Sequence, residues 1–316
     1  MTGRPRVAGR LVRAGTVALV MALGLGACGA AAPSGSGAAA TLEVVTTTTI
    51  LADLVEQVGG PLVRVESLVP KGGEVHTFDP TPSDVRRLTD AKIMFRNGLG
   101  LDDWLATFAT DAGTTAPIVA LGEDLAGVTY LAGTGHVGEA DQAVNPHLWL
   151  DIAYAAKYAV RIGETLASVD PAHAAAYADG AQAYAGILAA FDAETRTRLA
   201  AIPATDRVVI SFHDAFPYFA AAYGLTVDGT IVDAPGQDPS AAQVAALVET
   251  VKAKGVKAIF TEAQFSDALA RTIADETGAT VVSGLYTDST GDAPQDTYAG
   301  LMRWNVDRVL EVLATP

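Results

Sequence analysis

The sequence predicts an α/β protein with two lobes, each containing a parallel sheet flanked by helices, joined by one long α-helix. Strand-like apolar runs alternate with helical segments in both halves of the chain, and parallel strands require such helical crossovers. Between the two alternating regions, a proline-free helical run extends from His173 to Leu199, interrupted only by Gly180 and Gly186. The length of 316 residues exceeds what one hydrophobic core usually organises, and it favours two domains of roughly 100–150 residues each.

The first alternation starts at Leu42. A strand-like run there is followed by a helical stretch over 50–58 and a second apolar run over 62–69, which together predict a βαβ unit. Thr81-Pro82-Ser83-Asp84 predicts a helix start, because proline is favoured in the first turn of a helix. The strand AKIMFRNG, a helix over 102–112 and a strand over 116–121 follow.

The second half repeats this alternation. Residues 122–145 lack apolar periodicity and predict a long surface loop, and helical patterning then extends over 152–201. Ile202-Pro203 ends the helical region. Apolar runs that predict the strands of a second sheet lie at 208–212, 225–232, 256–261 and 279–282.

The N-terminal segment predicts export. Four arginines precede an uncharged stretch over 14–27 that is too short for a permanent membrane helix, as in a secretion signal. Leu25-Gly26-Ala27-Cys28 resembles the bacterial lipoprotein processing signal, in which the cysteine thiol carries a diacylglycerol. Cys28 is therefore expected to become the lipid-anchored mature N-terminus; the alternative is a lone cysteine inside an uncleaved apolar anchor. It is the only cysteine, which excludes disulfides and thiolate metal ligands.

The predicted organisation has five parts. Residues 29–40 are rich in Gly, Ala, Ser and Pro, as flexible tethers are. We expect a lipoprotein signal peptide at 1–27, a tether at 28–40, an N-terminal lobe at 41–170, a linker helix at 171–203 and a C-terminal lobe at 204–316.

The charge balance is strongly acidic. The formal net charge is −15, and removal of the four signal-peptide arginines makes it more negative. This disfavours nucleic acid or an anionic lipid surface as a ligand. An acidic surface suits a cation binder, although it also serves ordinary solubility.

Three of the five histidines lie where strands or loops lead into helices. His76 follows the second predicted strand, His147 lies in NPHLWLD before a helix, and His213 follows the strand VVISF. In α/β folds ligands bind at the carboxyl ends of strands. Each histidine alone would more often be structural or solvated, so the surrounding segments decide the interpretation.

The segments HTFDPTPSD, NPHLWLD, SFHDAFPYFAAAYGL and GLYTDST, in this order, resemble the four ligand segments of the cluster A-I (TroA/ZnuA-like) solute-binding proteins of bacterial zinc and manganese ABC importers. The resemblance extends from about Leu42 to the end of the chain. It implies the two-lobed, long-helix architecture and an ABC permease as partner. It also implies four metal ligands, two from each lobe: His76, His147, His213 and Asp288.

This ligand set suits zinc, because zinc sites favour nitrogen and oxygen ligands in four-coordinate geometry. We therefore expect a monomeric, lipid-anchored binding protein on the extracytoplasmic face of the cell membrane that captures Zn²⁺, with Mn²⁺ as the alternative ion. His213 favours zinc, because manganese-importing relatives often have glutamate at the corresponding position.

Other polar residues near these segments have less specific interpretations. Asp151 is expected to cap a helix rather than bind metal, and Glu74 and Asp79 to be loop carboxylates that support the ligands at most. Glu262 either orients a ligand or has a structural role. His136 stands in place of the long His-rich loop of some zinc-importing relatives, and His173 is expected to be exposed.

Three rival functions remain open at this level. A zinc enzyme would need an open coordination position, whereas four protein ligands close the site, and the sequence has no HExxH motif. We therefore predict that the protein is not an enzyme. A surface adhesin with a structural metal site is compatible with a lipoprotein, although no motif requires it. A binding protein for an organic solute would need a cluster of aromatic and arginine side chains, and the cleft segments show no evident cluster of this kind.

Overall fold

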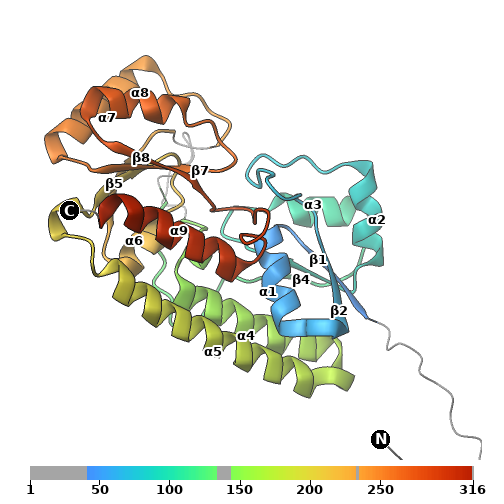
Figure 1. Ribbon diagram of the computed structural model, residues 1–316. Helices are drawn as coiled ribbons and strands as arrows, with labels where there is room; N and C mark the ends of the chain where they lie inside the picture. Colours follow the sequence, from blue (N-terminus) through green and yellow to red (C-terminus); the bar gives the residue numbers. More distant parts are fainter. Residues whose placement is uncertain (1–40, 134–143, 233–234, 315–316) are drawn as a thin grey trace, which may run out of the picture. The chain divides into compact units, whose positions relative to one another are not determined.

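The computed structural model describes residues 41–133, 144–232 and 235–314 (Figure 1). The predicted signal peptide, tether and Cys28 lie outside these residues, as does His136. None of the helices within the described ranges is long and apolar enough to cross a membrane.

The first lobe contains a parallel sheet with the strand order β2-β1-β3-β4. Alternate side chains of β1 enter different cores: Val44 packs in the core that includes α1, and Val45 packs with residues of α2 and α3. Helices therefore cover both faces, as an all-parallel sheet requires. The elements are β1 (Leu42–Thr46), α1 (Thr49–Gly59), β2 (Val63–Ser67), α2 (Pro82–Asp90), β3 (Ile93–Arg96), α3 (Trp104–Asp111) and β4 (Ile118–Ala120).

The second lobe repeats this topology with the order β6-β5-β7-β8. Ile210 and Ile259 pack in a core with residues of α7 and α8, whereas Val209 and Phe260 belong to the core shared with α6 and α9. The elements are β5 (Val208–Ser211), α6 (Pro217–Tyr223), β6 (Thr226–Thr230), α7 (Ala241–Lys254), β7 (Ala258–Glu262), α8 (Ala268–Thr277) and β8 (Thr280–Leu285).

Two long helices lie between the two sheets in chain order, and the second of them, α5, connects the lobes. Helix α4 (Ile152–Val169) ends before Asp170-Pro171, and α5 (Ala174–Leu199) continues for 26 residues without a break. The two helices run side by side in Figure 1, and α5 also contacts α1 and α6. The predicted fold of two parallel α/β lobes joined by a long helix is confirmed; the predicted division into domains stays a prediction.

The last helix, α9 (Tyr298–Leu313), follows β8 after a loop that comprises residues 286–297. It packs against β8 and also against α1 and α5. Its buried residues, which include Tyr298, Leu301 and Val306, join the core that contains α1. The C-terminal helix therefore packs in a core that contains residues of both lobes.

Candidate metal centre

The four predicted ligands follow strands or precede a helix. His76 lies between β2 and α2, His213 follows β5, and Asp288 follows β8. His147 stands directly before a short 3₁₀ turn (Leu148–Leu150) that leads into α4. Three of the four therefore lie beyond the carboxyl ends of parallel strands, where backbone loops leave side chains free to converge.

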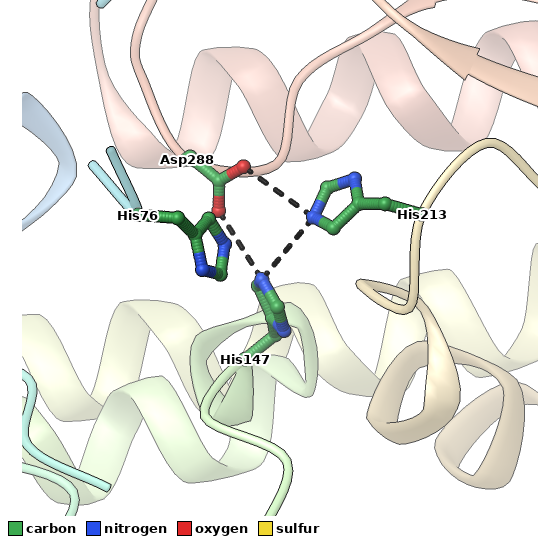
Figure 2. A group of neighbouring side chains, drawn as sticks. All are labelled: His76, His147, His213 and Asp288. Atoms are coloured by element: carbon green, nitrogen blue, oxygen red, sulfur yellow. Dashed lines mark hydrogen bonds and ion pairs between the residues drawn. The ribbon is translucent and has the colours of Figure 1, made fainter. Parts of the chain in front are cut away.

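These side chains converge on one point (Figure 2). One potential ligand atom from each of His76, His147, His213 and Asp288 lies within 4.8 Å of all the others. The last three residues are buried and His76 is half-buried. This is the only such group of three or more His, Cys, Asp or Glu side chains among the residues that the structure describes.

The distances between these atoms suit a tetrahedral ion. The Nε2 atoms of His147 and His213 are 3.4 Å apart. From His147 Nε2 to Asp288 Oδ1 the distance is 3.4 Å, and from His213 Nε2 to Asp288 Oδ2 it is 3.7 Å. Bonds of about 2.0–2.1 Å in a tetrahedral zinc site place neighbouring ligand atoms about 3.3–3.4 Å apart. The spacing of His147, His213 and Asp288 is therefore close to that of a tetrahedral site, and His76 lies within 4.8 Å of them as the fourth side chain.

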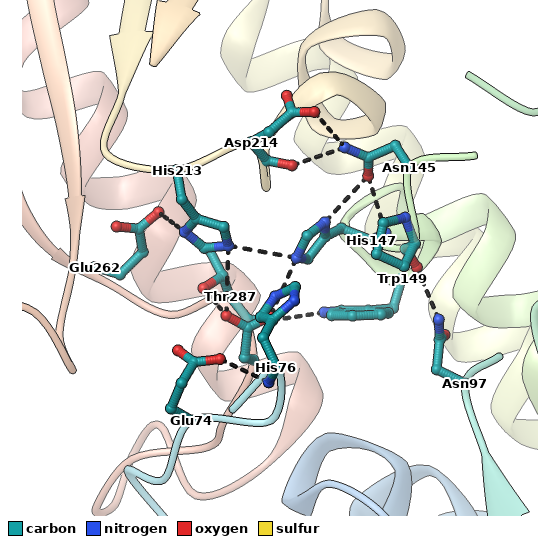
Figure 3. A network of polar contacts seen from close by, with 12 residues as sticks. Glu74, His76, Asn97, Asn145, His147, Trp149, His213, Asp214, Glu262 and Thr287 are labelled. Atoms are coloured by element: carbon teal, nitrogen blue, oxygen red, sulfur yellow. Dashed lines mark hydrogen bonds and ion pairs between the residues drawn. The ribbon is translucent and has the colours of Figure 1, made fainter. Parts of the chain in front are cut away.

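A carboxylate contacts the Nδ1 atom of the His213 ring. Glu262, at the end of β7, places Oε1 2.9 Å from Nδ1 of His213, and both side chains are buried. Figure 3 shows this contact. A carboxylate oxygen beside Nδ1 favours the tautomer that carries its proton on Nδ1 and has its free lone pair on Nε2. Of the two roles that the sequence left open for Glu262, this contact favours orientation of a ligand.

An amide performs the same role for His147. The side-chain nitrogen of Asn145 donates to the backbone oxygen of Asp214 at 2.7 Å and to its carboxylate at 3.1 Å. This fixes the amide oxygen toward His147, whose Nδ1 lies 3.1 Å away and whose backbone N–H also donates to it. Because this oxygen can only accept, it favours the His147 tautomer that has its free lone pair on Nε2.

Two neighbouring side chains hold Asp288. Its Oδ2 atom accepts hydrogen bonds from the hydroxyl of Thr287 at 2.9 Å and from the amide of Gln264 at 3.1 Å. Oδ1, the other oxygen, faces His147. Asp288 can therefore offer one oxygen to an ion while the second stays hydrogen-bonded.

The site has an excess of carboxylates. Burial lowers the pKa of His213, but Glu262, Asp288 and Glu74 raise it more strongly, to about 9. Burial and the charge of Asp288 raise the pKa of Glu74 to about 7. Burial also raises the pKa of Asp288, yet the hydrogen-bonding His147 and the other imidazoles hold it below its usual range. Such a cluster attracts a cation.

Other residues that the sequence suggested have different places. Asp151 caps α4, accepting a hydrogen bond from the backbone N–H of Ala153 at 2.9 Å, as expected. Asp79 is exposed in the loop after His76, whereas Glu74 accepts a hydrogen bond from the His76 backbone N–H at 2.9 Å. His173 pairs with Asp170 at 2.6 Å.

Sequence reasoning missed two of the supporting side chains. Asn145 stands in the NPH segment itself, and a polar residue two positions before a ligand was the available signal. Gln264 follows β7 closely, so its place beyond a strand end could have marked it. Neither belongs to a periodic pattern, and each has a partner distant in sequence: Asn145 is held by Asp214, and Gln264 donates to Asp288.

Comparisons with known proteins agree with this geometry. Residues 44–312 match the family described as "Zinc-uptake complex component A periplasmic". The iron-binding protein YfeA of Yersinia pestis is 33% identical over 87% of this chain and 87% of its own. The manganese-binding lipoprotein MntA of Halalkalibacterium halodurans is 29% identical over 94% of this chain and 97% of its own.

A solved structure extends the likeness to the fold. The periplasmic zinc-binding protein TroA from Treponema pallidum has a TM-score of 0.78 and 26% identity, covering 87% of this chain and 100% of its own. The family consists of transporter components rather than enzymes. Because the matching region spans both lobes, the chain belongs to the family of zinc-uptake component A, the metal-binding periplasmic substrate-binding proteins of ABC importers.

Proposed function

We propose that His76, His147, His213 and Asp288 together bind one divalent transition metal ion, that zinc is the preferred ion, and that the protein delivers it to an ABC permease. The convergence of the four ligand atoms within 4.8 Å carries this proposal. Three imidazoles and one carboxylate favour zinc over the harder manganese ion, and zinc stands above manganese in the Irving–Williams order.

Two further features belong to the proposal. Cys28 carries the lipid that anchors the mature protein to the cell membrane on its extracytoplasmic face, which fits relatives named as lipoproteins. The protein acts as a monomer with lobes at 41–170 and 204–316, because one chain supplies all four ligands. Metabolic labelling with a fatty acid, compared between wild type and Cys28→Ala, tests the anchor.

Metal analysis of the purified protein tests the site. We expect one zinc ion per chain after incubation with a zinc–manganese mixture and removal of the excess. Asp288→Ala should lower this occupancy strongly, whereas Asp79→Ala, which changes an exposed carboxylate in the same region, should leave it unchanged. Two tightly bound ions per chain, or none, would exclude the proposed site.

His213 decides between zinc and manganese. Since relatives of this chain are named for manganese and iron as well as zinc, competition titrations are needed. His213→Glu should weaken zinc binding and narrow the gap to manganese, because a carboxylate is the harder ligand. His213→Ala should open a coordination position and weaken zinc binding further. If wild type binds manganese more tightly than zinc, the protein is a manganese-binding member of the family.

A further inference from the structure

The loop that carries Asp288 follows a strand of the second lobe but is attached largely to the first. We call residues 286–297 the Asp288 loop. At its start, the amide of Asn305 in α9 pairs with the backbone N–H and C=O of Tyr286, at 2.9 and 2.7 Å. Gln264 of the second lobe reaches Asp288 itself. Apart from these and the approach of His213 to Asp288, the hydrogen bonds described below join the loop to the first lobe and to the segment before α4.

Two hydroxyl groups form the centre of this attachment. The Thr49 hydroxyl, at the start of α1, lies 3.2 Å from the hydroxyl of Ser289. It also accepts a hydrogen bond from the backbone N–H of Thr290 at 2.9 Å. In the other direction, the backbone N–H of Gly72 donates to the Ser289 hydroxyl at 2.7 Å. The loop is thus joined to α1 and also to the segment that leads to His76.

The hydroxyl groups of Thr49 and Ser289 can form all of these hydrogen bonds at the same time. Ser289 donates its single hydroxyl proton to the backbone oxygen of Thr290 at 3.0 Å, so Thr49 must donate to Ser289. Thr49 then accepts from Thr290, and Ser289 accepts from Thr49 and Gly72. Because Ser289 is 4% exposed, water offers little replacement if one partner is removed.

Buried contacts on both sides of the pair strengthen the attachment. The indole N–H of Trp149 donates to the backbone oxygen of Thr287 at 2.7 Å. Asp53 of α1 accepts a hydrogen bond from the backbone N–H of Tyr298 at 2.8 Å, where α9 begins. By contrast, the exposed ion pair of Lys71 with Asp292 contributes little.

We propose that Thr49 and Ser289 are positioning residues that fix Asp288 to the first lobe, beside His76 and His147. The sequence suggested two ligands from each lobe. With this attachment, Asp288 is held by the first lobe together with His76 and His147. His213 is oriented from the second sheet by Glu262 of β7, and Asp288 keeps one hydrogen bond to the second lobe, from Gln264. Loss of the hydroxyl pair frees the Asp288 carboxylate to leave the ion.

The test builds on the metal binding proposed above and measures dissociation. Zinc-loaded Thr49→Val and Ser289→Ala are mixed with a chromophoric chelator, and we expect each to release zinc about tenfold faster than wild type, as loss of one or two buried hydrogen bonds implies. Thr49→Ser keeps the hydroxyl and should restore the wild-type rate. The matched control Thr89→Val removes an exposed hydroxyl on α2 and should change nothing.

A spectroscopic measurement separates positioning from general stability. In the cobalt-substituted protein, the intensity of the visible absorption bands reports the coordination geometry, and we expect Thr49→Val and Ser289→Ala to change it. A merely structural role would lower the melting temperature of the metal-free protein and leave the cobalt spectrum unchanged.

The outcomes distinguish the two proposals. If wild type binds zinc and both variants keep its dissociation rate and cobalt spectrum, the positioning role is wrong. If wild type binds no divalent metal, the proposed function itself fails. Should Ser289→Ala not fold, the comparison of Thr49→Val with Thr49→Ser decides.

Discussion

His213 lies among three carboxylates, and the metal-free site therefore holds protons where a cation would bind. Glu262, Asp288 and Glu74 raise the pKa of His213 to about 9 despite its burial. The pKa of Glu74 is raised to about 7 by burial and by Asp288. A metal ion must displace the His213 proton from the site, because only the unprotonated Nε2 atom can bind it.

Zinc binding should release a proton even at pH values well above the ordinary pKa of histidine. At pH 7.5 we expect roughly one proton released per zinc, and an affinity that weakens as the pH falls below 9, instead of only near the ordinary histidine value of about 6.5. Calorimetric titrations in two buffers of different ionisation enthalpy measure this number. Glu262→Gln should reduce it, because Glu262 contributes most to raising the pKa of His213. Zinc binding without proton release at pH 7.5 would contradict the argument.

The raised pKa values of His213 and Glu74 also make the stability of the metal-free protein depend on pH. Both folded-state values exceed the unfolded ones, 6.5 for His213 and 4.5 for Glu74. The stabilising contribution of Glu74 is therefore complete below pH 4.5 and is lost as the pH rises through about 7. The contribution of His213 is complete below pH 6.5 and is lost as the pH rises through about 9. The metal-free protein should melt at a lower temperature at pH 9.5 than at pH 6.5.

At the scale of elements, the two glycines of helix α5 have different surroundings. The sequence marked Gly180 and Gly186 as weak points of a long helix, yet α5 passes through both without a break. A Cβ atom on Gly180 would lie 2.2 Å from the backbone oxygen of Val58, so α1 and α5 approach closely there. At Gly186 a Cβ atom would have no neighbour within 4 Å.

Alanine substitutions at these positions should have opposite effects. Gly186→Ala should raise the free energy of unfolding by about 0.5–1 kcal/mol, because alanine restricts the unfolded chain and favours helix. Gly180→Ala should lower it by about 1–3 kcal/mol, because the backbone of Val58 must move. Urea denaturation measures both values. Equal stabilisation by the two variants would show that α1 and α5 do not pack as described.

The sequence predicts features that depend on neighbouring residues better than features that depend on contacts between distant parts of the chain. The run over 62–69 is a strand only over Val63–Ser67. Leu68 and Val69 lie beyond the strand but are buried, so their apolar side chains extend the strand-like pattern past its end. The four proposed ligands were recognisable from local segments, but the attachment of the Asp288 loop was not. Thr49 and Ser289 are 240 residues apart, and no local pattern connects them.

For the whole molecule, α5 and the Asp288 loop both limit how the lobes can move. Helix α5 is continuous over 26 residues and contacts helices that belong to both lobes. A sharp bend requires proline or a comparable defect, and α5 contains no proline. The first lobe also holds the Asp288 loop through the hydrogen bonds of Thr49 and Gly72.

Metal binding should therefore change the dimensions of the molecule little. For a chain starting at Thr41, small-angle scattering of the metal-free and zinc-loaded forms should give radii of gyration that agree within their fitting error. A matched measurement on the Thr49→Val variant shows whether the attachment limits the motion. A large decrease in the wild-type radius on zinc binding would indicate a hinged closure that a continuous α5 does not allow.

The position of Trp149 gives the protein an internal optical reporter. Its ring centroid lies 5.3 Å from that of His147, and its indole N–H is bonded to the peptide oxygen next to Asp288. The other two tryptophans have different surroundings: Trp104 packs on Phe78, and Trp304 donates to the backbone oxygen of Gly284. A cation bound between His147 and Asp288 would lie closest to this one indole of the three. We therefore expect the ultraviolet emission of the unlabelled chain to change as a metal ion fills the site.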